Sequence, residues 1–390
     1  MKSTRLEFIR TASLGAAVAA VPSLLRAAVP ATTAAATPPT PNAVSSIPVL
    51  IDWHTHFITK AEVRILRART TAPRVFDDTD GTTKLENAST VSSLARQPSG
   101  FEVSDIAARI SHLDKVGIQR QLLSHTVALG LDATLPVSEL RVLFRAFNDE
   151  LAEVVRAHPT RFFGVAALPS ADPVWAAEEL HRAHKDLGLI GGSLPLNAFA
   201  TLEGARTLAP IFAAGQKNKS HFFIHRGPAN SVVPGQPPLI LPTDTDYARW
   251  SVINNHHLTH GAITLGLTDF LDPYPDVSVQ VIMLGGFFPY ILDSLIASSQ
   301  KAGVPDPLGR IRRIYLDPGP YARNGKWVAL AADTIGADRV LFGTDYGVGG
   351  GNKGDSAPGL AALAEALTTE QKRLIYSENS RLLLKSKGLI

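Results

Sequence analysis

The chain has 390 residues, 45% of them hydrophobic, which is enough for one large α/β barrel or two ordinary domains with a real core. It contains no cysteine, which excludes disulfides and thiolate metal sites, so imidazole and carboxylate groups must hold any metal ion. The totals are 38 basic and 35 acidic residues, and removing the four basic and one acidic residues of positions 1–46 leaves 34 of each. No basic face for nucleic acid or anionic lipid is implied.

Residues 1–46 have the layout of an export signal followed by a linker. Basic residues precede an apolar run from Thr11 to Leu25, and a stretch rich in Ala, Thr and Pro follows. The run is too short to span a membrane comfortably, so we expect no membrane span after export. The sequence from Thr4 to Arg10 resembles a twin-arginine export motif in which Leu6 replaces the second arginine. We therefore predict a periplasmic or otherwise exported protein, with a disordered N-terminal extension as the alternative.

Residues 47–390 show the alternation of short β-branched runs and longer amphipathic runs that is typical of βα units. Helices are predicted at Ser138–His158, from its apolar spacing, and at Asp172–Leu187, which opens with an N-cap and a proline. Eight strands close a (β/α)8 TIM-like barrel, so we predict this α/β fold. The eight predicted strands are Val49–His56, Arg120–His125, Phe162–Leu168, Leu189–Leu196, Phe222–His225, Val277–Leu284, Ile314–Asp317 and Val340–Tyr346.

Two connections are longer than a minimal barrel needs. Phe57–Gly100 shows little periodicity, and Gly227–Tyr247 is rich in Pro and Gly. Both follow strands, so in a barrel both would lie over the mouth where active sites form. We expect them to act as lids.

Candidate metal ligands end three of the predicted strands. His54 and His56 are two positions apart at the end of the first strand, so both side chains point to one face. His225 ends the fifth strand and Asp345 lies at the end of the eighth. Three imidazoles and a carboxylate, with an open position for water, make a catalytic site of the zinc type. One ion is expected, because the fourth strand carries no lysine or glutamate to bridge a second.

These motifs resemble the amidohydrolase superfamily, and within it the amidohydrolase-2 group that includes aminocarboxymuconate-semialdehyde decarboxylase and related aromatic-acid decarboxylases. The resemblance rests on the Asp-x-His-x-His opening at Asp52, on Phe163–Pro169 with the helix start after it, and on Leu341–Tyr346. It implies that His54, His56, His225 and Asp345 hold one divalent ion, expected to be zinc. The resemblance also implies that the protein can form a homodimer. Arg96 lies near the place of a carboxylate-binding arginine in these decarboxylases, although a surface position is the simpler interpretation.

One departure from the family pattern concerns the proton path. Members usually end the sixth strand with His-x-Gly-Gly, and here Met283 stands in place of the histidine. A thioether cannot accept a proton, so another group must do so. Asp345 is the first candidate and His125 the second. His256 and His260, one helical turn apart, are interpreted as ordinary helix histidines.

Three functional hypotheses follow. The first is non-oxidative decarboxylation of a small aromatic or unsaturated carboxylic acid. The second is hydrolysis of a C–N, C–O or C–C bond by metal-bound hydroxide, with Asp345 as the proton acceptor. The third is a non-catalytic binding protein on the same barrel, which the presence of all four candidate ligands argues against.

Overall fold

The computed structural model describes residues 50–390, apart from 78, 80–82, 87–104, 239–246 and 348–355. These described residues belong to one compact unit, Ile47–Ile390. The predicted export signal and Arg96 lie outside the described residues, so both stay predictions. Within the part of the chain that the structure describes, no helix is long and apolar enough to cross a membrane.

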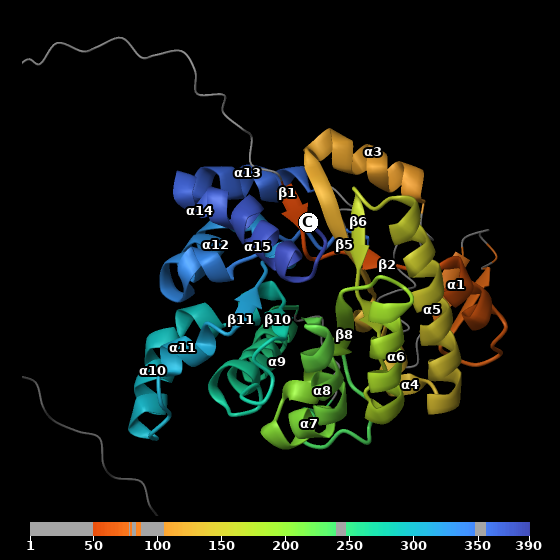
Figure 1. The fold of residues 1–390 in the computed structure, drawn as a ribbon, viewed down its shortest axis with the longest axis horizontal. Coiled ribbons are helices and arrows are strands. Elements are labelled where there is room, and N and C mark those ends of the chain that lie inside the picture. The colour runs from red at the N-terminus through yellow and green to blue at the C-terminus, as the bar shows by residue number, and fades with distance from the viewer. Residues whose placement is uncertain (1–49, 78, 80–82, 87–104, 239–246, 348–355) are drawn as a thin grey trace, which may run out of the picture. The chain divides into compact units, whose positions relative to one another are not determined.

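Parallel strands form the centre of the fold, and helices surround them (Figure 1). β5 pairs with β1, β2 and β6, and a second run of parallel strands extends from β7 to β11. β6 and β7 are two pieces of the predicted third strand, and the Ile190 N–H donates to the Gly164 carbonyl at their junction (2.9 Å). The strands are β1 (Leu50–Asp52), β2 (His56–Phe57), β5 (Ile118–His125), β6 (Phe162–Gly164), β7 (Ala166–Ala167), β8 (Gly191–Pro195), β9 (His221–His225), β10 (Ser278–Val281) and β11 (Ile314–Leu316).

The segment Val340–Tyr346 closes the barrel, although it is not a continuous strand. On one side the Leu341 N–H donates to the Leu316 carbonyl (2.8 Å), and on the other the Trp53 N–H donates to the Phe342 carbonyl (2.9 Å). Isolated parallel bridges lie along both edges. The predicted (β/α)8 barrel is confirmed, with this segment as its eighth member.

The helices form the outer layer. The two that were predicted from spacing and capping are confirmed as α5 and α6, and Asp172 caps α6 by accepting from the Trp175 N–H. The helices are α1 (Lys60–Arg67), α3 (Ile106–Val116), α4 (Leu131–Thr134), α5 (Val137–Ala157), α6 (Pro173–Lys185), α7 (Leu202–Thr207), α8 (Ala209–Asn218), α9 (Tyr247–Leu267), α10 (Leu292–Lys301), α11 (Pro307–Ile311), α12 (Gly325–Ala331), α13 (Ala357–Ala366), α14 (Thr369–Arg373) and α15 (Asn379–Ser386).

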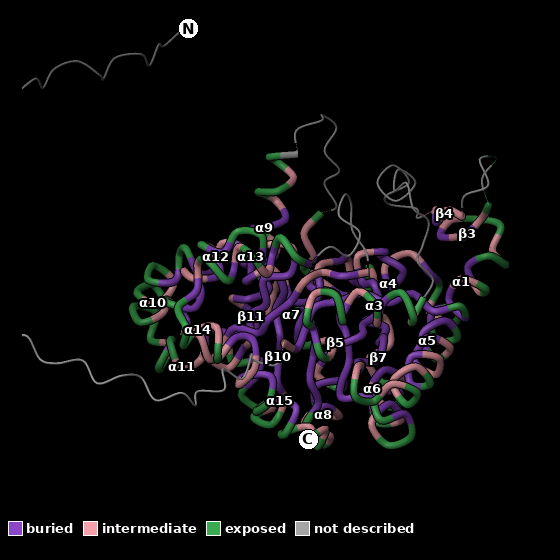
Figure 2. Tube along the Cα trace, turned by 90° about the horizontal axis from the view of Figure 1, so that it is seen from above, coloured by how far each residue is buried: buried purple, intermediate pink, exposed green. Residues whose placement is uncertain are grey.

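The core lies between the strands and the inner faces of these helices (Figure 2). β8 and β9 are buried at every position, as expected for parallel strands that are covered on both faces. α5 buries Leu140, Leu143 and Phe147 on one side. The carboxyl ends of the strands are therefore held in fixed positions by packing on both sides.

The connection after the first strand is more regular than predicted. It contains α1 and an antiparallel hairpin of β3 (Arg74–Asp77) and β4 (Thr83–Glu86). Thr59 caps α1 by accepting from the Glu62 N–H (3.0 Å), and Val75 and Leu85 are buried. Each hairpin strand has four residues, which is too short to give a visible alternation in the sequence. The second long connection is described as far as residue 238, and its role as a lid stays a prediction.

Asp52 is a buried carboxylate at the junction of the first strand and the eighth segment. It accepts hydrogen bonds from the Thr344 hydroxyl (2.6 Å), the Gln121 amide (2.9 Å) and the backbone N–H groups of His54 and Thr344 (both 3.1 Å). Burial raises the pKa of Asp52 to about 6, although these hydrogen bonds act in the opposite direction. Asp52 thus links the two segments that close the barrel.

Replacing Asp52 with alanine should leave these four donors, two of them buried and two half-buried, without their acceptor. We expect Asp52→Ala to lower the free energy of unfolding by about 3–5 kcal/mol, measured by urea denaturation. Thr83→Ala is the control, because it removes only an exposed hydrogen bond to Asp77, and it should cost less than about 0.5 kcal/mol. Equal losses in the two variants would contradict the role of Asp52 in closing the barrel.

Candidate metal centre

Four side chains meet at the carboxyl ends of the strands, as predicted: His54, His56, His225 and Asp345. One ligand atom of each lies within 4.8 Å of the ligand atoms of the other three. The three imidazole rings lie edge to face, with centroids separated by 5.3, 5.2 and 4.6 Å. This spacing suits a single ion with ligand bonds of about 2.0–2.2 Å.

The backbone of Asp345 is in the left-handed region, with φ at +64°. This conformation costs about 1–2 kcal/mol for a residue other than glycine, so the surrounding structure must hold it. The Asp345 N–H donates to the His54 carbonyl (2.8 Å), which fixes two of the four candidate ligands relative to each other. The strained turn thus places the carboxylate beside the imidazoles.

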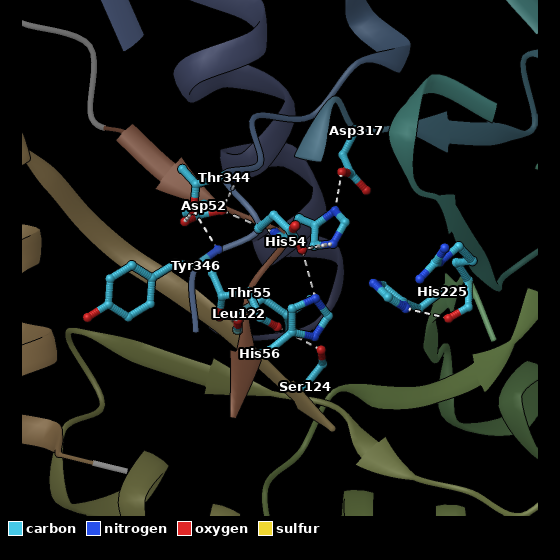
Figure 3. Close-up of polar contacts among 12 residues, drawn as sticks. Asp52, His54, Thr55, His56, Leu122, Ser124, His225, Asp317, Thr344 and Tyr346 are labelled. Atoms are coloured by element: carbon cyan, nitrogen blue, oxygen red, sulfur yellow. Dashed lines mark hydrogen bonds and ion pairs between the residues drawn. The ribbon is translucent and has the colours of Figure 1, made fainter. Parts of the chain in front are cut away.

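Asp317, directly after β11, orients His54. The Nδ1 atom of His54 lies 2.6 Å from Asp317 Oδ1, and the second Asp317 oxygen accepts from the Gln280 amide (2.6 Å). Figure 3 shows the Asp317 carboxylate at one edge of the His54 ring and His56 on the other side. Because Nδ1–H donates to the carboxylate, Nε2 is the nitrogen left to bind a metal, the arrangement usual for metal-binding histidines.

The other two histidines also present a nitrogen to the site. His225 Nδ1 donates to the Arg226 carbonyl (2.9 Å), which directs its Nε2 away from the backbone. His56 Nε2 lies 2.9 Å and His54 Nε2 lies 3.2 Å from Asp345 Oδ1. The buried His54 Nε2 faces Asp345 Oδ1 at the edge of hydrogen-bond distance, and a cation at the centre of the cluster would bind both atoms. The donor set therefore fits a divalent metal ion.

Burial and charge set different protonation states for these histidines. Burial lowers the pKa values of His56 and His225, and that of His225 falls well below its usual range, so both are neutral ligands. Burial also acts to lower the pKa of His54, but Asp317 and Asp345 outweigh it and raise that pKa to about 10. Burial opposes ionisation of Asp345, yet hydrogen bonds to His54 and His56 hold its pKa well below the usual range. The metal-free site thus carries a proton on His54 between two carboxylates.

The accessible side of the cluster is at Asp345. Its side chain is 26% exposed, compared with 0% for His54 and 2% for His56. A substrate would therefore approach the ion past the Asp345 carboxylate.

The family comparison agrees with this geometry, since a model described as "Amidohydrolase" matches residues 51–385. The chain belongs to this amidohydrolase family. The resemblance predicted from the motifs is confirmed, as is the barrel fold.

The relatives of this amidohydrolase include decarboxylases. Gamma-resorcylate decarboxylase of Rhodococcus jostii (strain RHA1) is 27% identical over 270 residues, which cover 63% of this chain and 78% of that protein. The 2-amino-3-carboxymuconate-6-semialdehyde decarboxylase of Dictyostelium discoideum is 31% identical over 256 residues, covering 62% of this chain and 66% of that protein. These relatives agree with the first functional hypothesis.

A solved structure shows the same fold. The 5-carboxyvanillate decarboxylase of Novosphingobium aromaticivorans DSM 12444, complexed with manganese and 4-hydroxy-3-methoxy-5-nitrobenzoic acid, superposes with a TM-score of 0.65 at 20% identity. The match covers 87% of this chain and 97% of that one. That structure contains manganese, whereas zinc is the ion predicted here.

Met283 does not continue the sixth strand of the amidohydrolase. β10 ends at Val281, and both Met283 and Leu284 have left-handed backbones, with φ of +51° and +56°. The Leu284 N–H donates to the Asp317 carbonyl (2.8 Å), which links this turn to the residue that orients His54. Met283 is half-buried and packs against the core, so it supplies no proton acceptor.

The remaining predicted residues lie elsewhere. His125 is buried and pairs with Glu62 (3.0 Å), apart from the four-ligand cluster, so Asp345 is the better of the two predicted proton acceptors. His256 and His260 lie on α9 with their Nε2 atoms 3.0 Å apart and do not join the cluster.

The residues that support the ligands were not predicted. Asp317 is the last residue of a predicted strand. Its position at a strand end could have predicted that it lies at the barrel mouth. Gln280 gave no such signal, because an isolated glutamine in a buried strand has no characteristic spacing. Asp52 was predicted only as part of the opening motif, without its contact to Thr344.

Metal analysis tests the cluster directly. We expect the purified protein to bind about one divalent ion per chain, and His225→Ala to lose it because three ligands remain. His260→Ala is the matched control, since it removes a histidine outside the cluster, and should retain the ion. Loss of metal in the control, or retention in His225→Ala, would contradict the assignment. Both contents are measured by atomic emission after exhaustive dialysis.

Metal affinity should depend on pH through His54. Its pKa is raised to about 10 in the metal-free site, so at pH 7 the proton must leave when the ion binds. We expect release of about one proton and a gain in affinity of roughly tenfold per pH unit between pH 7 and 9. Calorimetry in buffers of different ionisation enthalpy measures both.

Asp317→Asn provides the comparison for this dependence. The variant loses one of the two charges that hold the His54 proton, so its proton release at pH 7.5 should decrease, and its metal affinity should fall about 10- to 100-fold. Identical proton release by the wild type and the variant would show that His54 is not the titrating group.

Proposed function

We propose that this amidohydrolase is a divalent-metal-dependent decarboxylase of a small aromatic carboxylic acid. The observation that carries the proposal is the cluster of three histidines and one partly exposed aspartate at the barrel mouth. Relatives that match most of their own length, such as gamma-resorcylate decarboxylase at 78%, support this choice over hydrolysis. We take the substrate class, small aromatic carboxylic acids, from the names of these relatives.

Non-oxidative decarboxylation breaks the bond between a ring carbon and the carboxylate carbon, and a proton replaces the departing CO₂ on the ring. When bound, the ion supplies positive charge that holds and polarises the oxygen atoms of the substrate. The buried walls at His54 and His56 exclude water from that side of the substrate. The chain must then accept and return one proton at the ring.

Asp345 is the group placed for that proton transfer. Contacts with the two histidines keep its pKa well below the usual range in the metal-free site despite burial, and a bound cation would act in the same direction. Its partly exposed carboxylate can accept a proton from a ring hydroxyl and return it to the ring carbon. Met283 and His125 do not compete for this role, since one is a thioether and the other is paired with Glu62.

Two finer points belong to the proposal. Three imidazoles favour zinc over harder ions, whereas a neighbour of the same fold contains manganese, so the metal analysis decides between them. Export by residues 1–46 remains part of the proposal on the grounds of their composition alone.

Carbon dioxide release from a panel of hydroxybenzoates tests the activity. We expect the metal-loaded wild type to release CO₂ from at least one ortho-hydroxylated acid, with an equal yield of the phenol. Asp345→Asn should reduce the rate by at least about 100-fold, because it cannot accept the proton. Arg381→Gln, on the outer surface, is the control and should keep the wild-type rate. Metal-loaded protein that hydrolyses amides or esters, and releases no CO₂ from the panel, would contradict the proposal.

A further inference from the structure

Arg226 directly follows the candidate ligand His225 at the end of β9. Its backbone carbonyl accepts the hydrogen bond from His225 Nδ1 (2.9 Å). Its guanidinium lies over the ring of Trp250 on α9, 4.4 Å from the ring centroid, and 3.4 Å from Asn254 Oδ1. The backbone of Arg226 therefore supports a metal ligand, while its side chain is held in place by α9.

The guanidinium of Arg226 has no carboxylate partner in the part of the chain that the structure describes, and it contacts the tryptophan ring and the asparagine oxygen. Half-buried arginines elsewhere in the barrel do have one, as Arg182 pairs with Glu179 (2.6 Å) and Arg313 with Asp272 (2.5 Å). Burial lowers the pKa of Arg226, and the charge of Asp345 acts in the opposite direction. A cation withdrawn from water without an anion is unfavourable, and binding an anionic ligand would remove that cost.

The surroundings of Arg226 contain further polar groups from separate elements. Tyr321 lies in the short helical turn Gly319–Arg323 after β11, and its hydroxyl donates to Asn255 Oδ1 (3.0 Å). Asn254, which the Arg226 guanidinium contacts, and Asn255, which Tyr321 contacts, are consecutive residues of α9, so the arginine and the tyrosine lie on the same part of this helix. We call Arg226, Asn254, Asn255 and Tyr321 the arginine corner. It adjoins His225, so a molecule bound at the metal would have this corner at its side.

We propose that Arg226 binds the carboxylate of the aromatic acid and sets the specificity for an anionic substrate. This inference rests on the proposed function. The planar guanidinium matches a carboxylate with two parallel hydrogen bonds, and the Trp250 ring holds it flat. Because CO₂ leaves without charge, the contact stabilises the bound acid more than the transition state. Removing it should therefore raise KM and leave kcat unchanged or slightly higher.

The test compares Arg226→Gln and Arg226→Lys with the wild type, all loaded with the metal. Calorimetry measures the Kd of 2,6-dihydroxybenzoate and of its neutral amide, 2,6-dihydroxybenzamide. Arg226→Gln should weaken binding of the acid by about 10- to 100-fold and change that of the amide by less than about twofold. Arg226→Lys should recover part of the loss, because an ammonium keeps the charge but not the paired hydrogen bonds.

Two controls separate this role from a structural one. Metal content should be unchanged in both Arg226 variants, since the carbonyl that supports His225 belongs to the backbone and survives any substitution. Arg206→Gln removes an exposed arginine that pairs with Asp269 and should leave both affinities unchanged. If Arg226→Gln and Arg226→Lys both lose the metal, Arg226 supports the ligands instead, and the proposal is wrong.

The outcomes also separate this inference from the proposed function. A wild type that releases CO₂ from the acid, with an Arg226→Gln variant of the same Kd and KM, would overturn the role of Arg226 alone. A metal-loaded wild type that binds neither the acid nor the amide would overturn both proposals. A fall in kcat with unchanged KM would also contradict carboxylate binding.

Discussion

The candidate site depends on the closure of the barrel between its first strand and its last segment. The Trp53 N–H donates to the Phe342 carbonyl, the Asp345 N–H to the His54 carbonyl and the His56 N–H to the Tyr346 carbonyl, at distances of 2.7–2.9 Å. Three of the four candidate ligands lie on this seam. Residues almost 300 positions apart in the sequence thus become neighbours, as in the pair of His56 and Asp345. Only His225 reaches the site from elsewhere in the barrel.

The second constraint is electrostatic. Asp317 and Asp345 lie on either side of His54, and in the metal-free protein a proton on that ring offsets their charge. A divalent ion supplies more positive charge at the same place, so metal binding and proton release are linked. Arg226 adds a further positive charge next to the ligands. This distribution of charge supports the proposal of an anionic substrate.

Much of this site could be predicted because its ligands end parallel strands. Strand ends in a barrel converge at one mouth, so His54, His56, His225 and Asp345 could be grouped from their positions alone. The supporting residues could not be predicted in this way. The register between the first strand and β11 determines which side chain contacts His54. The amino-acid sequence around Asp317 does not specify that register.

The departures from the predicted fold have local causes. The hairpin of β3 and β4 is too short to show an alternating pattern, and the predicted sixth strand ends early because Met283 and Leu284 adopt left-handed backbones. The turn that replaces the strand end contacts Asp317 through backbone atoms, so it supports the site without supplying a proton acceptor.

A crystal structure with anomalous diffraction recorded at the absorption edge of the bound metal tests the account most directly. We expect one strong peak per chain, within about 2.0–2.3 Å of a nitrogen of each of His54, His56 and His225 and of a carboxylate oxygen of Asp345. A peak at His256 and His260 on α9, with none at the four-ligand cluster of metal-loaded protein, would contradict it.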